Sequence, residues 1–278
     1  MNSSQKTVKF NATYDYVFKE VFKDSKLCVS LINAILNTDY KSEDITYISE
    51  SINGLFIDSK TSNFDIAIMV GDHTKLVIEM QKNPPSYDMK QRLLYYVLQL
   101  YYSDYKKGQI YDSKDNIVIC LTDYNILERD KWIDIYTFKN SDNDEIVGIK
   151  IVILDFKKIK YCDNIEVKGW VDMITRTDFS EFEGVTEQIT AAAEKVVELN
   201  ENQKEYLRIL SNLEEYDKRQ KMIRESEIEK KGRIEGRIEG IIQAKKEFIK
   251  NMYLAGISVK QIADISKVSV EEVYDIIK

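Results

Sequence analysis

The sequence is poor in the residues that build most metal and thiol sites. Its 278 residues include one histidine and three cysteines, and no two cysteines form a C-x-x-C pair. The single histidine, His73, lies in a predicted turn, which argues against a histidine-based metal site or a Ser-His-Asp triad. The wide spacing of Cys28, Cys120 and Cys162 argues against a zinc site or a disulfide framework, so we expect three reduced thiols.

Long apolar runs and a strongly basic composition are also missing. No apolar run approaches the ~20 residues of a membrane span, and residues 1–10 lack the apolar segment of a signal peptide. We therefore expect a cytoplasmic protein with no membrane partner. The formal net charge is −7, and residues 161–199 hold nine acids and three bases, a balance of 3 − 9 = −6. The rest of the chain is close to neutral and can present a local basic face, although tight non-specific DNA binding is not favoured.

A β-hairpin with two unusual acids is the most informative segment. Residues 64–70 and 75–81 are short, apolar arms separated by a turn that contains a glycine. Asp65 opens the first arm and Glu79 lies near the end of the second, so antiparallel pairing predicts that both acids meet at one end. The period of two places Gln81 on the same side as Glu79. Two carboxylates at a strand end can hold Mg²⁺; the alternative is that both acids lie at solvated hairpin ends.

The spacing of Asp65 and Glu79-Met80-Gln81 resembles the PD-(D/E)XK nuclease core in its (D/E)-x-Q form. The chain is similar to the recombination-promoting nuclease (Rpn) family, also described as transposases of this superfamily. The resemblance covers residues 12–160 well and the tail loosely. The matching segments around the acids are residues 14–22, 31–36, 92–96 and 108–111, with Lys60 before the aspartate.

The resemblance implies a DNA endonuclease that uses Mg²⁺, with Mn²⁺ as a substitute. Asp65 and Glu79 would hold the metal, and Gln81 would orient the attacking water. Many members of the superfamily have lysine at this last position, and glutamine carries no positive charge. The implied DNA contacts are Lys60, Gln91, Arg92 and Tyr95.

Gln91, Tyr95 and the first predicted helix each have a second, purely structural interpretation. Gln91-x-x-x-Tyr95 resembles the Q-x-x-x-Y helix motif of RecB-type nucleases, but tyrosine is abundant here and this helix can simply pack on the sheet. Asp15 and Lys19 share one face of the first predicted helix. They form either an exposed ion pair or part of the border of the site, as the family resemblance suggests.

The predicted fold is α/β, a restriction-endonuclease-like mixed sheet flanked by helices and followed by an all-α tail. Composition divides the chain into a nuclease-like domain at 1–160, an acidic then mixed-charge helical segment at 161–231, and a tail at 232–278. The predicted helices cover residues 13–22, 26–36, 88–106, 187–213, 215–231, 248–254, 259–265 and 270–277. The predicted strands beyond the hairpin cover residues 45–51, 54–57, 116–121, 132–138 and 147–156.

The tail contains a glycine repeat and a small helical module. Gly232, Gly236 and Gly240 share one helical stripe, which predicts a self-association helix or, second, a hinge. We therefore expect a homo-oligomer formed through the C-terminal helices. The last helices resemble a helix-turn-helix, but their acids would repel DNA phosphates. Besides the nuclease, two alternatives stay open: a catalytically weak DNA-binding or recombination accessory protein, and an oligomeric regulatory module.

Overall fold

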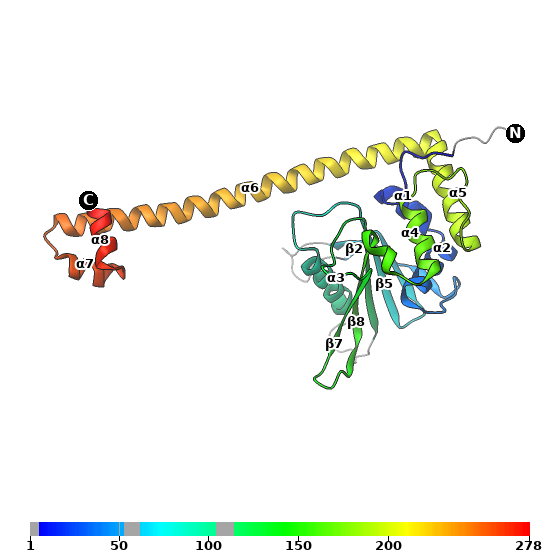
Figure 1. Ribbon diagram of the computed structural model, residues 1–278, viewed down its shortest axis with the longest axis horizontal. Helices are drawn as coiled ribbons and strands as arrows, with labels where there is room; N and C mark the ends of the chain where they lie inside the picture. Colours follow the sequence, from blue (N-terminus) through cyan, green and yellow to red (C-terminus); the bar gives the residue numbers. More distant parts are fainter. Residues whose placement is uncertain (1–5, 50, 53–61, 104–113) are drawn as a thin grey trace. The chain divides into compact units, whose positions relative to one another are not determined.

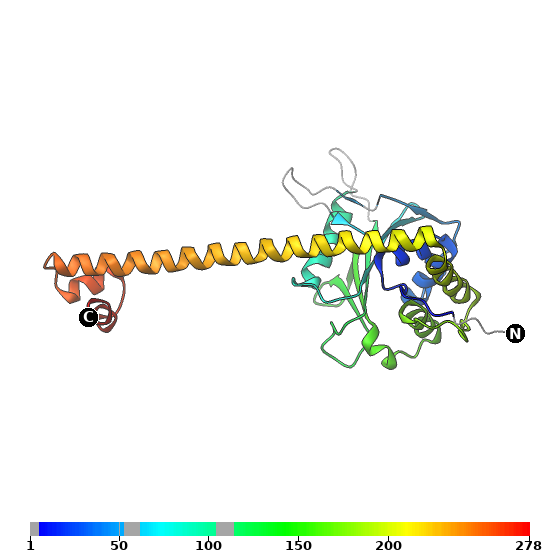
Figure 2. The ribbon, with the colours of Figure 1, turned by 90° about the horizontal axis from the view of Figure 1, so that it is seen from above.

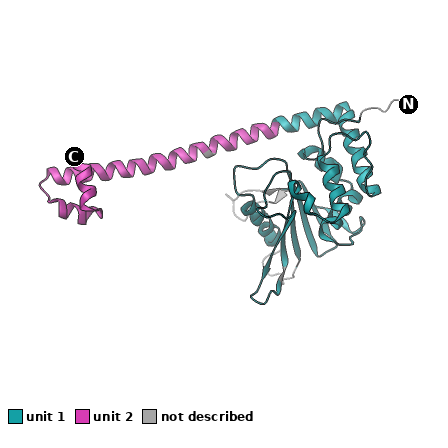
Figure 3. Ribbon diagram, viewed as in Figure 1, with its two compact units in different colours: residues 1–214 teal, residues 215–278 magenta. Residues whose placement is uncertain are grey.

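The computed structural model describes residues 6–49, 51–52, 62–103 and 114–278. The chain divides into two compact units, residues 1–214 and 215–278 (Figure 3). Lys60 and the predicted segments at 54–57 and 108–111 lie outside the described residues.

A six-stranded mixed sheet forms the centre of the first unit, in the order β1-β4-β5-β6-β8-β7. The pairs β5–β6 and β6–β8 are parallel, and the other pairs are antiparallel. Strands β2 and β3 form a separate antiparallel pair. The strands are β1 (Ile45–Tyr47), β2 (Ser51–Ile52), β3 (Ser62–Asn63), β4 (Ile66–Val70), β5 (Thr74–Gln81), β6 (Asp115–Thr122), β7 (Ile133–Lys139) and β8 (Glu145–Asp155).

Helices cover both faces of this sheet (Figure 1 and Figure 2). On one face, Ile66, Ile78 and Ile119 pack in a core with Ile209, from the start of α6 (Gln203–Leu254), and with residues of four further helices, among them the buried Phe18 and Trp170. These helices are α1 (Asp15–Phe22), α2 (Ser25–Leu36), α4 (Ile165–Thr175) and α5 (Glu187–Glu201). The 3-10 helix η1 (Phe156–Tyr161) leads from β8 to α4. The predicted layered α/β architecture with a helical C-terminal region is confirmed.

Helix α3 (Met89–Ser103) covers the other face and links β5 to the parallel strand β6. Its side chains Leu93, Tyr96, Val97 and Leu100 are buried against Val77 and other residues of the sheet. They recur at intervals of three and four residues, which is the spacing of one helix face. The amphipathic pattern therefore determines both the existence of α3 and the face that it turns to the sheet.

The predicted helix break near residue 214 is wrong. The chain breaks instead at Asn202, between α5 and α6 (Gln203–Leu254). The Asn202 side chain accepts hydrogen bonds from the backbone N–H groups of Lys204 at 3.0 Å and Glu205 at 3.2 Å. An asparagine that satisfies these free N–H groups is a preferred start of a helix. From there α6 continues without interruption through the glycine repeat.

The second unit contains the rest of α6, α7 (Val259–Ser266) and α8 (Val270–Ile277). Side-chain caps mark the starts of both short helices: the Ser258 N–H donates to the Gln261 side chain at 3.4 Å, and the Glu272 N–H donates to Ser269 at 3.1 Å. Gly256 has a φ of +85°, a left-handed conformation that favours glycine after a helix. The predicted short helix at 248–254 is the end of α6. Among the described residues, no helix is long and apolar enough to cross a membrane.

Candidate active site

The β4–β5 hairpin brings Asp65 and Glu79 together. Its register pairs Ile66 with Ile78, so the next pair outward is Asp65 and Glu79, whose side chains lie on one face. The Asp65 N–H donates to Glu79 Oε1 at 3.3 Å, and the Met80 N–H donates to Asp65 Oδ2 at 2.7 Å. The two acids therefore converge at the same end of the hairpin, as the turn predicts.

Gln81 joins these acids from the end of β5. Its Nε2 donates to Glu79 Oε2 at 3.3 Å, since two residues along a strand return to the same side. The amide is thus placed where it can orient a small polar molecule beside the acids. Gln81 supplies no positive charge, so a positively charged side chain at this site has to come from another element of the fold.

Arg92, from the first turns of α3, supplies one cation. Its Nη2 lies 3.8 Å from Glu79 Oε2. Its other N–H groups donate to the hydroxyls of Tyr87 and Tyr96, and its guanidinium lies 4.9 Å from the Tyr96 ring centroid. These contacts hold the guanidinium in a fixed orientation, with the fork geometry that suits carboxylate and phosphate oxygens.

Lys19, from α1, supplies a second cation. Its Nζ lies 3.2 Å from Asp15 Oδ1 and 3.6 Å from Asp65 Oδ1, so the ion pair within the helix extends to the site. The i, i+4 spacing of Asp15 and Lys19 is visible in the sequence. What the sequence does not reveal is that α1 ends up beside the start of β4. The role of this pair therefore stays open from the sequence alone.

Burial has a large effect on both acids. Only 1 % of Glu79 and 13 % of the Asp65 side chain are exposed. Burial raises the pKa of Glu79 to about 7, against the opposing influence of Arg92. Burial likewise raises the pKa of Asp65 well above its usual range, and the negative charges of Glu79 and Asp15 add to this effect. The site therefore holds its negative charge at a cost in free energy, which a bound cation would reduce.

The donor set fits a hard divalent cation. It offers carboxylate and amide oxygens, and a Mg²⁺ site needs only one or two carboxylates because the ion keeps several waters. No cluster of three or more His, Cys, Asp or Glu side chains suited to a metal occurs in the part of the chain that the structure describes. A divalent ion at this position would therefore be held by the two acids and by water, and not by an all-protein cage.

Two other predicted contacts lie on α3, away from the Glu79 side chain. Gln91 lines a cavity of about 290 Å³ between α3 and the strands β7 and β8, together with Tyr136 and Phe138. The Tyr95 hydroxyl accepts a hydrogen bond from Gln99 at 2.9 Å. The structure thus gives Gln91 and Tyr95 different surroundings, and their contact with DNA stays a prediction.

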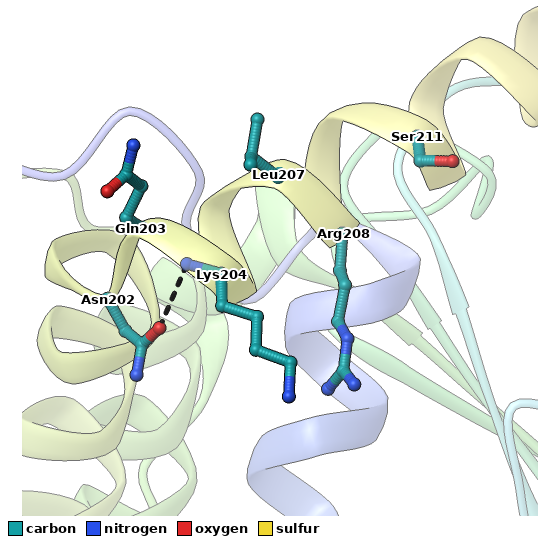
Figure 4. Close-up of a pocket in the computed structure, with 6 residues that line it drawn as sticks. All are labelled: Asn202, Gln203, Lys204, Leu207, Arg208 and Ser211. Carbon is teal, nitrogen blue, oxygen red and sulfur yellow. Dashed lines mark hydrogen bonds between the residues drawn. The ribbon is translucent and has the colours of Figure 1, made fainter.

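A surface hollow at the start of α6 is separate from these residues (Figure 4). Its lining includes none of the predicted site residues. The residues that line it are Asn202, Gln203, Lys204, Leu207, Arg208 and Ser211.

The raised pKa of Glu79 predicts a pH-dependent stability of the metal-free protein. Unfolded, this carboxyl ionises near pH 4.5; folded, it ionises near pH 7, so the free energy of unfolding falls as the pH rises through this interval. At about 1.4 kcal/mol per pKa unit, the loss is at most roughly 3 kcal/mol. This loss is measured by urea unfolding in the presence of a chelator at several pH values. It is the change with pH in the difference in free energy of unfolding between wild type and Glu79→Gln. A difference that stays constant across the interval would contradict the prediction.

Comparison with known proteins places this geometry in a family. Residues 12–230 match the family model described as PD-(D/E)XK nuclease family transposase. Searches of curated proteins and of solved structures each found no match. The matched span contains the whole sheet, both acids and the helices that bring Lys19 and Arg92 to them. The mixed sheet between helices is also consistent with the restriction-endonuclease-like fold of this superfamily. The chain therefore belongs to the PD-(D/E)XK nuclease family transposases.

Proposed function

We propose that this protein is a metal-dependent DNA endonuclease of the recombination-promoting type, which hydrolyses phosphodiester bonds. The observation that carries the proposal is the convergence of two acids at one end of the hairpin, the buried Glu79 and the largely buried Asp65, with Gln81 bonded to Glu79. A structural role alone does not require two acids to share one buried position. Such a pair costs stability, and pairs of this kind occur at catalytic sites.

Asp65 and Glu79 would hold Mg²⁺, or Mn²⁺ in its place. When bound, such an ion lowers the pKa of a coordinated water and neutralises negative charge on a phosphate. The Gln81 amide orients the attacking water by a hydrogen bond. Lys19 and Arg92 bind phosphate oxygens of the DNA, since both are cations beside the acids and both are partly exposed.

The surrounding residues extend the proposed DNA contact. Gln91 and Lys90 line the cavity beside α3, and Gln91 directly precedes Arg92 in the chain. We include Gln91, Tyr95 and Lys60 as contacts to the DNA backbone, as the family resemblance implies. A cytoplasmic location and a homo-oligomer formed through the C-terminal helices belong to the same proposal.

A cleavage assay on supercoiled plasmid tests the proposal. We expect wild type to nick or linearise the plasmid with Mg²⁺ or Mn²⁺ and not with a chelator, and Glu79→Gln to lose at least about 10³-fold in rate, because a metal ligand contributes several kcal/mol. Asp172→Asn is the matched control: it removes one carboxylate of an exposed ion pair with Arg176 and should keep the wild-type rate. Cleavage by Glu79→Gln at the wild-type rate would refute the assignment of the site.

One observation favours a second candidate, a DNA-binding accessory protein with a degenerate site. Both oxygens of Glu79 already have partners, since Oε1 accepts from the Asp65 N–H and Oε2 from Gln81, with Arg92 nearby. An acid held in this way can serve as a structural anchor instead of a metal ligand. DNA binding in a gel shift that persists without metal, combined with no cleavage in any divalent cation, would support this candidate over the nuclease.

A further inference from the structure

Helix α6 exposes a row of isoleucines in the second unit. Ile234 is 60 % exposed, Ile238 52 % and Ile241 60 %, although isoleucine is usually buried in folded proteins. Their spacing of four and three residues places them on one face of the helix. We call these three residues, with the half-exposed Ile242, the isoleucine stripe.

The isoleucine stripe continues a face of α6 that packs against α7 and α8 farther along the helix. Ile249 and Met252 follow Ile238 and Ile241 by eleven residues each, close to three turns of a helix at 3.6 residues per turn. Both are buried in a small core with residues of α7 and α8, among them Ile262 and Val273. One end of this face is therefore covered by the chain's own helices, and the isoleucine stripe is its uncovered continuation.

The glycine repeat lies on the opposite side of α6. Gly232, Gly236 and Gly240 each precede an isoleucine by two residues, which is a rotation of about 200° around the helix. A Cβ atom added at any of the three would meet nothing within 4 Å. Among the described residues of this chain, no other backbone therefore approaches the glycines. The apolar face of α6 lies on the opposite side of the helix.

Charges on the two flanks of the isoleucine stripe differ in sign. At about 100° per residue, Lys230, Arg233 and Arg237 lie on one side of it, and Glu235 and Glu239 lie on the other. Lys231, on the acidic side, is ion-paired with Glu235 at 3.8 Å. Two parallel copies of the helix would place the basic flank of each against the acidic flank of the other. Antiparallel copies would place flanks of like charge together.

From this continuity and this charge pattern we propose that the isoleucine stripe is the seam of a parallel homodimer. The occupant of the stripe is α6 of a second copy of this chain, packed along residues 234–248. The glycine repeat is not part of the contact. This dimer specifies the homo-oligomer proposed above, and it does not depend on nuclease activity, because all of its residues belong to the second unit.

Sedimentation equilibrium of the full chain tests the seam. We expect wild type to dimerise and the triple variant Ile234→Ser, Ile238→Ser and Ile241→Ser to raise the dimer dissociation constant at least hundredfold, with circular dichroism as a check on folding. Ile228→Ser is the matched control, since Ile228 is 72 % exposed but lies off the stripe. It should change the constant less than threefold. A triple Gly→Ala variant at 232, 236 and 240 should not raise the constant.

The orientation has its own test. Lys245 falls within the same helix face, so Lys245→Cys should give a disulfide-linked dimer on mild oxidation when the helices are parallel and in register. Gly236→Cys, on the opposite face, should not. A monomeric wild type at every concentration, loss of the dimer in the Gly→Ala variant but not in the serine variant, or no cross-link at 245 would each overturn the proposal.

Discussion

Asp65→Asn is expected to abolish cleavage and at the same time to stabilise the metal-free protein. The substitution keeps the shape of the side chain and an oxygen that can accept the Met80 N–H bond. It removes a negative charge from a buried position beside Glu79 and Asp15, where ionisation is unfavourable. We expect cleavage to fall by at least about 10³-fold and the free energy of unfolding to rise by about 0.5–2 kcal/mol, the usual gain when such a strained site is relieved.

The opposite signs of the two effects make this a discriminating experiment. Plasmid cleavage and urea unfolding with a chelator measure them on the same preparation. Adding Mn²⁺ should raise the melting temperature of wild type and leave that of Asp65→Asn unchanged, because only wild type binds the ion. Asp172→Asn again serves as the control. If Asp65→Asn were less stable than wild type and still cut DNA, Asp65 would be a structural residue.

Lys19→Ala is expected to lower the cleavage rate by about a hundredfold, the effect of removing one charge-stabilising donor from an active site. Lys19 Nζ lies 3.6 Å from Asp65 Oδ1, and its charge lowers the pKa of that acid. Without it, the proton binds Asp65 more tightly, so the acid limb of the pH–rate profile should move to higher pH. Lys19→Arg keeps the charge and should recover part of the rate.

Rate measurements over a range of pH distinguish this role from a purely structural one. Lys23→Ala is the matched control on the same helix, because Lys23 forms an exposed ion pair with Glu20 and does not contact the acids. It should leave both the rate and the profile unchanged. A Lys19→Ala variant with the wild-type rate and profile would show that Gln81 and Arg92 suffice without this lysine.

Local patterns in the sequence predict much of this fold. The hairpin, the buried face of α3 and the starts of α7 and α8 each follow from residues close together in the chain, so spacing and caps specify them. The junction at Asn202 was missed because the mixed charges of the following helix give little periodicity. The asparagine itself, as a favourable helix cap, was the available signal.

Local sequence patterns predict only part of the candidate site. Asp65, Glu79 and Gln81 lie on one hairpin, and a period of two brings them together without knowledge of the rest of the fold. Lys19 and Arg92 approach them from helices on opposite faces of the sheet. Their positions depend on how α1 and α3 pack, which is a long-range property that no local pattern contains. The tyrosines around Arg92 were missed for the same reason.

The place of Glu79 on β5 divides the site into rigid and adjustable parts. Strand β5 is hydrogen-bonded to β4 on one side and to β6 on the other, so the backbone beneath this acid cannot shift without breaking two ladders. Lys19 and Arg92 reach the acids on long side chains from helices that no ladder fixes to the strands. Substrates of different shape would therefore be accommodated by small movements of the Lys19 side chain, while Glu79 and the tyrosine-bound Arg92 keep their places.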